Sequence, residues 1–166
     1  GEGAGVIQAW VSPDQDVLPY GPIVAMLRDS ANSMEILPDD QLAVLRELFP
    51  DIHGSLVSPP PREAMPADEA RRRLEDALLN LVEVALPAET VLCVEDAHRA
   101  DEGTLRLLAR IAEIRFLILT CRSEETPSDH PLRVLMRRLR KRGLAADLAL
   151  GSLHPEAVRK LLTRLS

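Results

Sequence analysis

The chain has 166 residues, the length of one domain, and 46% of them are hydrophobic, so it can bury a core of its own. Only 2% are aromatic, too few for a surface that stacks nucleic-acid bases, and the net charge of -6 disfavours non-specific binding to nucleic acid or anionic membranes. No apolar run approaches the roughly 20 residues of a membrane span, and no signal-peptide pattern opens the sequence, so we expect a cytoplasmic protein.

The first part of the chain is expected to contain one strand and three helices, separated by polar and proline-rich connections. The expected elements are a strand at residues 6–11 and helices that begin at Pro22, at Pro38-Asp-Asp40 and at Asp68. The strand is mostly apolar on both faces, as strands inside a covered sheet usually are. The helix over residues 68–86 has the clearest apolar stripe. We expect residues 51–67, with four prolines, to form a mobile loop within a single domain that spans residues 1–166.

The second part of the chain alternates strands with helices. The expected elements are strands at residues 90–94, 116–121 and 147–150, and helices that begin at Asp101, Pro131 and His154-Pro155, with Gly143 capping the second of these helices. The last helix bears an apolar stripe formed by Val158, Leu161, Leu162 and Leu165. This alternation is typical of an α/β fold with a parallel sheet.

Two consecutive carboxylates, Glu95 and Asp96, follow the apolar strand at residues 90–94. In open α/β sheets, ligands bind at the carboxyl ends of the strands. Carboxylates placed there can hold Mg²⁺, which clamps phosphate oxygens, and a second carboxylate can orient a water molecule. Acidic residues after a strand also serve as helix caps or solvated turn residues, and the pair alone does not separate these interpretations.

An arginine, Arg122, follows the next apolar strand at the same predicted edge of the sheet. A guanidinium there can bind a phosphate. The alternative interpretation is an ion pair between Arg122 and a neighbouring carboxylate such as Glu95 or Asp96. The two cysteines, Cys93 and Cys121, are interpreted as small buried residues, because they are too few for a disulfide framework and have no zinc-type spacing to the histidines.

Together these segments resemble the core of AAA/STAND-type signal-transduction ATPases, which form modules of large bacterial regulators such as LuxR-type activators. Val91-Leu-Cys-Val-Glu-Asp-Ala-His-Arg-Ala-Asp101 resembles the Walker B stretch of that family, although Arg99 stands where the family usually has Trp. Leu117-Ile-Leu-Thr-Cys-Arg-Ser-Glu124 resembles its sensor-1 strand. Weaker matches are Leu18-Pro-Tyr-Gly-Pro-Ile23 and the segment 148–162.

The resemblance implies a three-layer P-loop NTPase-like fold with helices on both faces of a parallel sheet. In the intact module it implies that Glu95 and Asp96 hold Mg²⁺ and a water, and that Arg122 senses the γ-phosphate of ATP. The family's phosphate loop, GxxxxGK[ST], does not occur in this sequence, and the only lysines are Lys141 and Lys160. We therefore expect a partial module that lacks the first strand and binds ATP weakly or not at all on its own.

The missing strand has a consequence for partners. In the family it lies between the sensor-1 strand and the last strand, so its absence exposes unpaired sheet edges. We expect these edges to pair with the rest of a parent regulator or with another copy of the chain. The alternative function is a degenerate, non-catalytic interaction scaffold with the same fold. A third interpretation, a nucleic-acid-binding helix at residues 132–142, is less favoured than a solvated basic helix face, so we expect no direct nucleic-acid binding.

Overall fold

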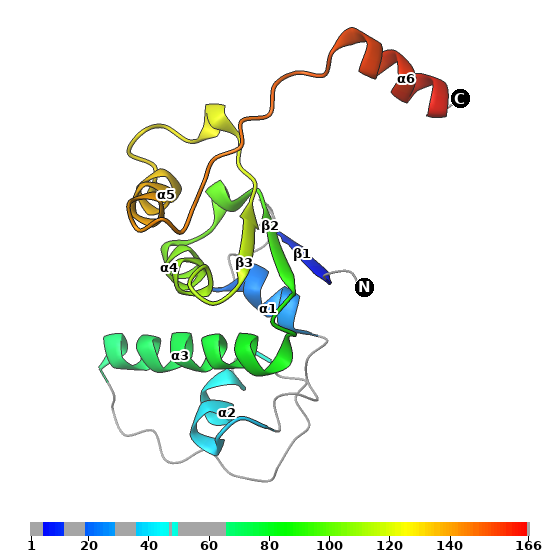
Figure 1. Ribbon diagram of the computed structural model, residues 1–166. Coiled ribbons are helices and arrows are strands. Elements are labelled where there is room, and N and C mark those ends of the chain that lie inside the picture. Colours follow the sequence, from blue (N-terminus) through cyan, green and yellow to red (C-terminus); the bar gives the residue numbers. More distant parts are fainter. Residues whose placement is uncertain (1–4, 12–18, 29–35, 47, 50–65, 166) are drawn as a thin grey trace.

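A computed structural model of the chain describes residues 5–11, 19–28, 36–46, 48–49 and 66–165 (Figure 1). The strands are β1 (Val6–Trp10), β2 (Val91–Glu95) and β3 (Phe116–Leu119). The helices are α1 (Gly21–Leu27), α2 (Asp39–Leu45), α3 (Ala67–Ala85), α4 (Glu102–Ile111), α5 (Pro131–Lys141) and α6 (Pro155–Leu165), with 3₁₀ turns η2 (Ala97–Arg99) and η3 (Ser123–Glu125). The predicted end of the second helix at Pro50 and the loop at residues 51–65 lie outside the described residues, while Pro66 and Ala67 already belong to the start of α3.

The three strands form a parallel sheet in the order β1-β2-β3, which confirms the predicted α/β class. The strands start level with one another, since Val6 lies beside Val91 and Val91 lies beside Phe116. Because side chains alternate between the faces of a strand, this register sorts the sheet into two sets of residues. The set that belongs to the hydrophobic core is Ile7, Ala9, Leu92, Val94, Leu117 and Leu119.

Helices cover one face of this sheet. Figure 1 shows α4 and α5 to the left of the sheet and α3 across its lower end, with α2 beneath α3, while α1 lies against β1. Strands that follow one another in sheet order, joined by crossovers of one hand, place their connecting helices on the same face. The fully buried side chains of this layer include Ile23, Leu27, Leu78, Leu81, Leu107, Leu108 and Ile111.

The opposite face of the sheet has no helix against it in the described part of the chain. Its large side chains, Val6, Trp10, Phe116 and Ile118, are between 43% and 69% exposed. The expected arrangement with helices on both faces is therefore wrong for the described residues. The order β1-β2-β3 explains the difference, because every crossover along it returns on the side already occupied.

Two predictions for the end of the sheet are also wrong. Residues 147–150 do not form a strand, and Leu148 and Leu150 are almost fully exposed. A strand needs a neighbour for its backbone hydrogen bonds, and no described strand lies along the outer edge of β3. Cys93 is buried as predicted, but Cys121 is exposed, because β3 ends at Leu119 and the chain turns out of the sheet before Cys121.

Two polar clusters join the elements on the helix side. The Tyr20 hydroxyl donates a hydrogen bond to Glu75 Oε1 at 3.0 Å, and Arg106 Nε lies 3.6 Å from the same oxygen, so α1, α3 and α4 meet at a buried carboxylate. The Arg115 guanidinium donates to the carbonyl oxygens of Glu83 and Leu86. These carbonyls lack helical partners at the end of α3, so Arg115 ties that end to the start of β3. Among the described helices, none is both long and apolar enough to cross a membrane.

Candidate functional site at the carboxyl end of the sheet

The candidate site begins where β2 ends. Glu95 is the last residue of the strand, and Asp96 has a left-handed backbone with φ of 52°. This conformation costs free energy for a residue with a side chain, although Asp and Asn tolerate it better than most residues. The Asp96 N–H donates to Thr120 Oγ1 at 3.1 Å, which holds the turn against the end of β3. The two predicted carboxylates are thus placed by a strained turn that a hydroxyl on the neighbouring strand supports.

The Glu95 carboxylate already has several partners within the chain. Thr120 Oγ1 donates to Glu95 Oε2, and Gln8 Nε2 donates to Glu95 Oε1 at 3.0 Å. The Cys93 thiol lies 3.8 Å from Oε1, and burial followed by this carboxylate raises the pKa of the thiol above its ordinary value. Glu95 therefore links all three strands at their carboxyl ends.

Arg122 lies at the same edge. Its Nε is 3.7 Å from Asp96 Oδ1, and its Nη1 is 3.4 Å from Glu125 Oε1. The ion pair with a neighbouring carboxylate, one of the two interpretations of Arg122, is therefore present. The side chain is 60% exposed, so the pair is loosely held and accessible from solvent.

A second group of side chains supports this edge from η2 and η3. His98 Nε2 lies 3.0 Å from Glu125 Oε2, and Arg99 Nη2 donates to the same oxygen at 3.0 Å. Hydrogen bonds from Arg99 and then from His98 hold the pKa of Glu125 below its ordinary value. The His98 side chain is buried, and its Nδ1 faces Asp96 Oδ1 at 3.9 Å with no hydrogen-bond partner among the described residues. His98 thus braces the turn between η2 and η3.

The structure brings Glu95, Asp96 and Arg122 to one edge, and it adds Thr120 and Glu125, which sequence reasoning did not single out. A sequence signal existed for each of them. Thr120 is the first polar residue after the apolar run of β3, and Glu125 lies three residues after Arg122, the spacing of one 3₁₀ turn.

The donor chemistry at this edge suits a hard cation. Glu95 and Asp96 offer carboxylate oxygens, and Mg²⁺ typically uses one or two carboxylates together with phosphate oxygens and water. Within the described ranges there is no group of three or more His, Cys, Asp or Glu side chains arranged to hold a metal by themselves. A cation here would depend on oxygen atoms from a bound phosphate or from water.

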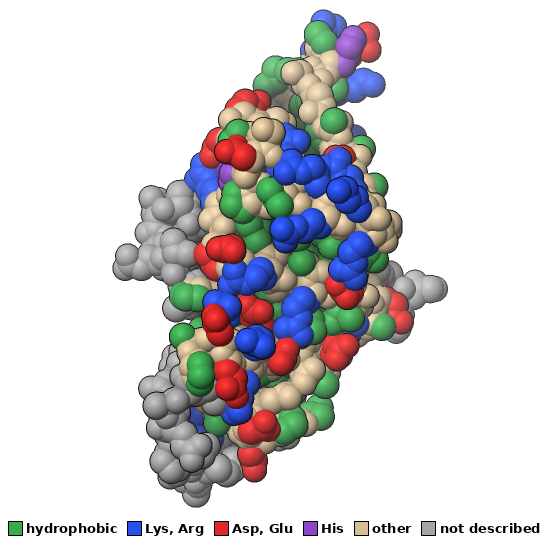
Figure 2. All heavy atoms as spheres, turned by 90° about the vertical axis from the view of Figure 1, so that its left-hand side faces the viewer, with side chains coloured by type: hydrophobic (Ala, Val, Ile, Leu, Met, Phe, Trp, Pro, Cys, Tyr) green, Lys and Arg blue, Asp and Glu red, His purple; other side chains and the backbone are tan. Residues whose placement is uncertain are grey.

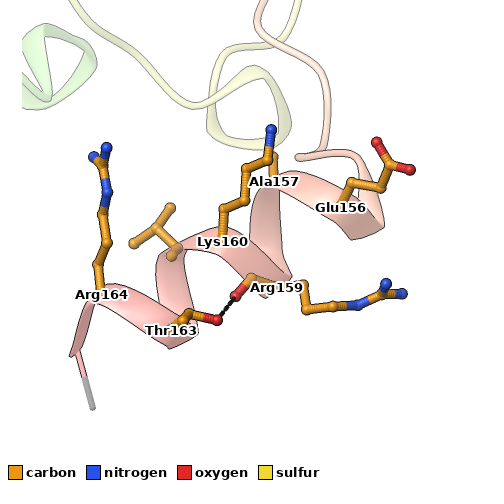
Figure 3. A pocket seen from close by; sticks show the side chains of 7 residues that line it. Glu156, Ala157, Arg159, Lys160, Thr163 and Arg164 are labelled. Atoms are coloured by element: carbon orange, nitrogen blue, oxygen red, sulfur yellow. Dashed lines mark hydrogen bonds between the residues drawn. The ribbon is translucent and has the colours of Figure 1, made fainter.

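Two other surface features offer no enclosed site. A recess beside α6 is lined by residues of that helix alone, with Lys160 and Arg164 on one side and Arg159 and Thr163 on the other (Figure 3). In it the Thr163 hydroxyl donates to the Arg159 carbonyl oxygen. Because the lining comes from a single helix, the recess is one side of an exposed helix rather than a pocket.

Basic side chains gather over α5 in the upper half of the view in Figure 2. Several of them already bind groups of the same chain. Arg137 donates to the Ser128 carbonyl, Arg140 pairs with Asp147, and Arg142 pairs with Glu113. The hydrogen bond from Arg142 lowers the pKa of Glu113. Since Leu132 and Leu139 point into the protein, α5 fits the prediction of a solvated basic face over an apolar stripe.

Comparison of the chain with models of protein families, with curated proteins and with solved structures finds no match in any of the three.

Proposed function

We propose that this chain is part of a regulatory ATP-binding module of the AAA/STAND type, within a multidomain bacterial signalling or transcription regulator. The supporting observation is the meeting of Glu95, Asp96 and Arg122 at the carboxyl edge of a parallel sheet, where such folds bind ligands. In this proposal the three strands belong to a larger P-loop NTPase-like sheet. The strained backbone at Asp96 supports the assignment, because strain is concentrated at functional turns.

The roles of the residues follow from their chemistry. Glu95 and Asp96 would hold Mg²⁺, which supplies positive charge to the phosphate oxygens of the nucleotide. The Thr120 hydroxyl donates to the Glu95 carboxylate and accepts from the Asp96 backbone N–H, so it holds the turn that carries both residues. Arg122 is exposed enough to exchange its loose pair with Asp96 for a γ-phosphate, which accepts charge-assisted hydrogen bonds from a guanidinium.

The sequence has no GxxxxGK[ST] loop to grip the phosphates. Each charge-assisted hydrogen bond lost with such a loop is worth about 1.5–3 kcal/mol, so several of them change affinity by orders of magnitude. We therefore propose that the loop comes from another part of the parent regulator, and that the 166 residues alone bind Mg-ATP weakly and do not hydrolyse it.

The test uses the parent polypeptide together with this chain. We expect a GxxxxGK[ST] sequence in the parent, and hydrolysis by the parent that is lost in Asp96→Asn and reduced in Arg122→Ala. Arg73→Ala is the control, since Arg73 pairs with Glu69 on the exposed side of α3, away from the site, and should leave hydrolysis unchanged. A parent without that loop, or micromolar ATP binding by the 166 residues alone, would overturn the proposal.

A second candidate function is a non-catalytic interaction scaffold with the same fold. It is favoured by one specific observation, which is that the charged groups already have partners within the chain: Arg122 pairs with Asp96 and with Glu125, and Glu95 is bonded to Thr120 and Gln8. In this case the parent lacks the loop, and association with other domains or copies replaces nucleotide binding, through the outer edges of β1 and β3, along which no described strand lies. A sedimentation series in which the mass never exceeds that of one chain, alone or mixed with the rest of the parent, would count against it.

A further inference from the structure

The helix α5 and its C-cap residue carry a concentration of positive charge. The basic residues of this stretch are Arg133, Arg137, Arg138, Arg140, Lys141 and Arg142, and the stretch contains no acidic residue. Figure 2 shows basic side chains gathered over this helix. The whole chain has a net charge of -6, so the charge of α5 is opposite in sign to that of the protein that carries it. A local field of this kind attracts anionic partners.

Two of the six charges are neutralised within the chain, since Arg140 pairs with Asp147 and Arg142 pairs with Glu113. Two others are not. The side chains of Arg138 and Lys141 are exposed, and they have no hydrogen bond or ion pair to any described residue. Part of the positive charge of α5 is therefore open to a partner.

The remaining two charges are oriented but not neutralised. Arg133 Nε donates to the Thr126 carbonyl oxygen at 3.1 Å, and Arg137 Nη1 donates to the Ser128 carbonyl oxygen at 2.7 Å. A carbonyl oxygen is uncharged, so it fixes the position of a guanidinium without cancelling its charge. Both guanidiniums also keep further N–H groups for other acceptors. The chain thus holds Arg133 and Arg137 in place while leaving their charge uncompensated.

The other basic run of the described chain, in α3, differs in this respect. Arg71 lies 2.8 Å from Asp68, and Arg73 lies 2.8 Å from Glu69. Each of these pairs joins residues three or four positions apart on one helix, which is how an exposed helix face commonly balances its charges. The stretch of α5 has no acidic residue to play this part. Its basic side is therefore more than an ordinary solvated face.

The uncompensated charges lie in a row. Arg133, Arg137 and Lys141 recur at every fourth residue, so they follow one another along the helix about 6 Å apart, with Arg138 beside Lys141. Like charges at this spacing destabilise a helix. Attraction to the helix C-terminus offsets this repulsion for the last turn, but not for Arg133 in the first turn. Carboxylates at the same spacing on a partner would remove the repulsion.

We propose that this basic row, made of Arg133, Arg137 and Lys141 with Arg138 beside it, is the docking surface for an acidic helix of a partner protein or domain. Carboxylates at every fourth residue of such a helix repeat at about the same 6 Å. A guanidinium can bind a carboxylate through two parallel hydrogen bonds. This inference does not depend on nucleotide binding.

An acidic helix is favoured over nucleic acid or an anionic membrane by the charge of the whole chain. A long polyanion or a charged membrane extends beyond α5 and meets the net negative charge of the rest of the protein. A short acidic helix is small enough to contact α5 alone.

The test measures binding of labelled helical peptides to the 166-residue chain by fluorescence anisotropy. One peptide has about 16 residues of alanine and glutamine with glutamate at every fourth position, and the other has the same composition with its glutamates spread around the helix. We expect the chain to bind the first peptide at least about threefold more tightly than the second. The affinity should fall between about 20 and about 200 mM salt, because exposed ion pairs are screened.

The variant Arg137→Gln/Arg138→Gln/Lys141→Gln should bind the first peptide about tenfold more weakly, as expected for the loss of three exposed ion pairs. Arg133 is left unchanged because its bond to the Thr126 carbonyl supports the fold. Far-UV circular dichroism reports whether the variant keeps its helices.

The matched control is Arg71→Gln/Arg72→Gln/Arg73→Gln in α3, which changes the net charge by the same amount and should bind the first peptide within about twofold of the unmodified chain. Equal weakening in the two triple variants would overturn the proposal, since binding would then follow net charge alone. Equal affinity for the two peptides, or no binding of either at low salt, would also overturn it. So would tighter binding of duplex DNA or of vesicles with anionic lipid that is lost in the α5 variant, because the row would then serve nucleic acid or a membrane.

Discussion

Asp96 occupies a backbone conformation that favours glycine, yet its side chain and its N–H both have contacts at the candidate site. Replacing it with glycine removes the steric cost, whereas replacing it with alanine keeps that cost and loses the side-chain oxygens. The difference in unfolding free energy between the two variants therefore measures the strain that the turn carries at this position.

We predict that Asp96→Gly is at least as stable as the unmodified chain and that Asp96→Ala is about 1 kcal/mol less stable than Asp96→Gly. Urea unfolding followed by circular dichroism measures both values. Arg72→Gly on the exposed side of α3 is the control with the opposite sign, and should lose about 1 kcal/mol because glycine weakens a helix. Equal stabilities for the glycine and alanine variants would show that the turn is not strained.

Tyr20 is the second described non-glycine residue with positive φ, and it is the only tyrosine in the chain. Burial, followed by the charge of Glu75, raises the pKa of Tyr20 from 10.0 to about 12. A group that holds its proton more tightly when folded stabilises the protein below its unfolded pKa. That contribution, about 2–3 kcal/mol, is lost as the pH rises from about 10 to about 12.

Tyr20→Phe removes the donor to Glu75 and should cost about 1–3 kcal/mol of unfolding free energy at pH 7. Above pH 10 the difference between the two proteins should shrink, because only the unmodified chain has a phenol to ionise. Urea unfolding at pH 7, 9, 10 and 11, with an absorbance titration of the single tyrosine, checks both parts. A gap that stays constant up to pH 11 would contradict the buried hydrogen bond.

At the scale of single elements, α4 depends on Asp101, the N-cap residue that precedes it. The Asp101 carboxylate accepts a hydrogen bond from the Thr104 N–H at 2.9 Å and another from the Thr104 hydroxyl. A side chain added at Gly103 would lie 2.9 Å from Asp101 Oδ1 and 3.2 Å from the Tyr20 hydroxyl, so the glycine leaves space for the cap and for the tyrosine.

Asp101→Ala should lower the free energy of unfolding by about 1 kcal/mol, because the N–H of Thr104 loses its acceptor. Asp101→Asn should keep most of the stability, since an amide oxygen caps a helix nearly as well. Thermal and urea unfolding of the two variants provide the comparison. If asparagine proved as costly as alanine, charge rather than the capping bond would be responsible.

The elements that could be predicted from sequence are those specified by local chemistry. Pro22 at the start of α1, Asp101 before α4 and Gly143 after α5 act within one helical turn. Gly143 has φ of 72°, and the Leu144 N–H bonds back to the Leu139 carbonyl, as in a glycine cap. Residues 147–150 failed as a strand because their hydrogen bonds depend on a neighbour that no local pattern specifies.

In the candidate site, too, some features could be predicted from the sequence and others could not. The carboxyl ends of parallel strands meet at one edge, so Glu95, Asp96 and Arg122 could be placed together before any coordinates. Their sequence signals mark Thr120 and Glu125 as polar residues near this edge, but the bonds from Thr120 to Glu95 and Asp96 and from Glu125 to His98 join residues 24 to 27 positions apart, and no local pattern specifies them.

At the scale of the whole molecule, the core is one-sided. The largest fully buried side chains come from the sheet face that meets the helices, from α1, α3 and α4, and from Leu45 of α2. Substitutions in α3 should therefore change the free energy of unfolding by very different amounts, depending on the side of the helix on which they lie.

Leu81→Ala should cost about 2–5 kcal/mol, because it leaves a cavity at a fully buried position in α3. Val84→Ala, three residues later on the exposed side, should stay within about 0.5 kcal/mol of the unmodified chain. Denaturant midpoints measure both changes. Similar losses in the two variants would mean that the outer side of α3 is covered in solution.

The two ends of the sheet are held by different kinds of contact, and Arg115 provides those at the amino end. Its bonds to the carbonyl oxygens of Glu83 and Leu86 clamp the amino end of the sheet to the longest described helix. At the carboxyl end, by contrast, Arg122 and Glu125 reach Asp96 and His98 through partly exposed side chains. The exposed ion pairs at the carboxyl end are therefore more open to exchange with solvent than the hydrogen bonds that Arg115 makes at the amino end.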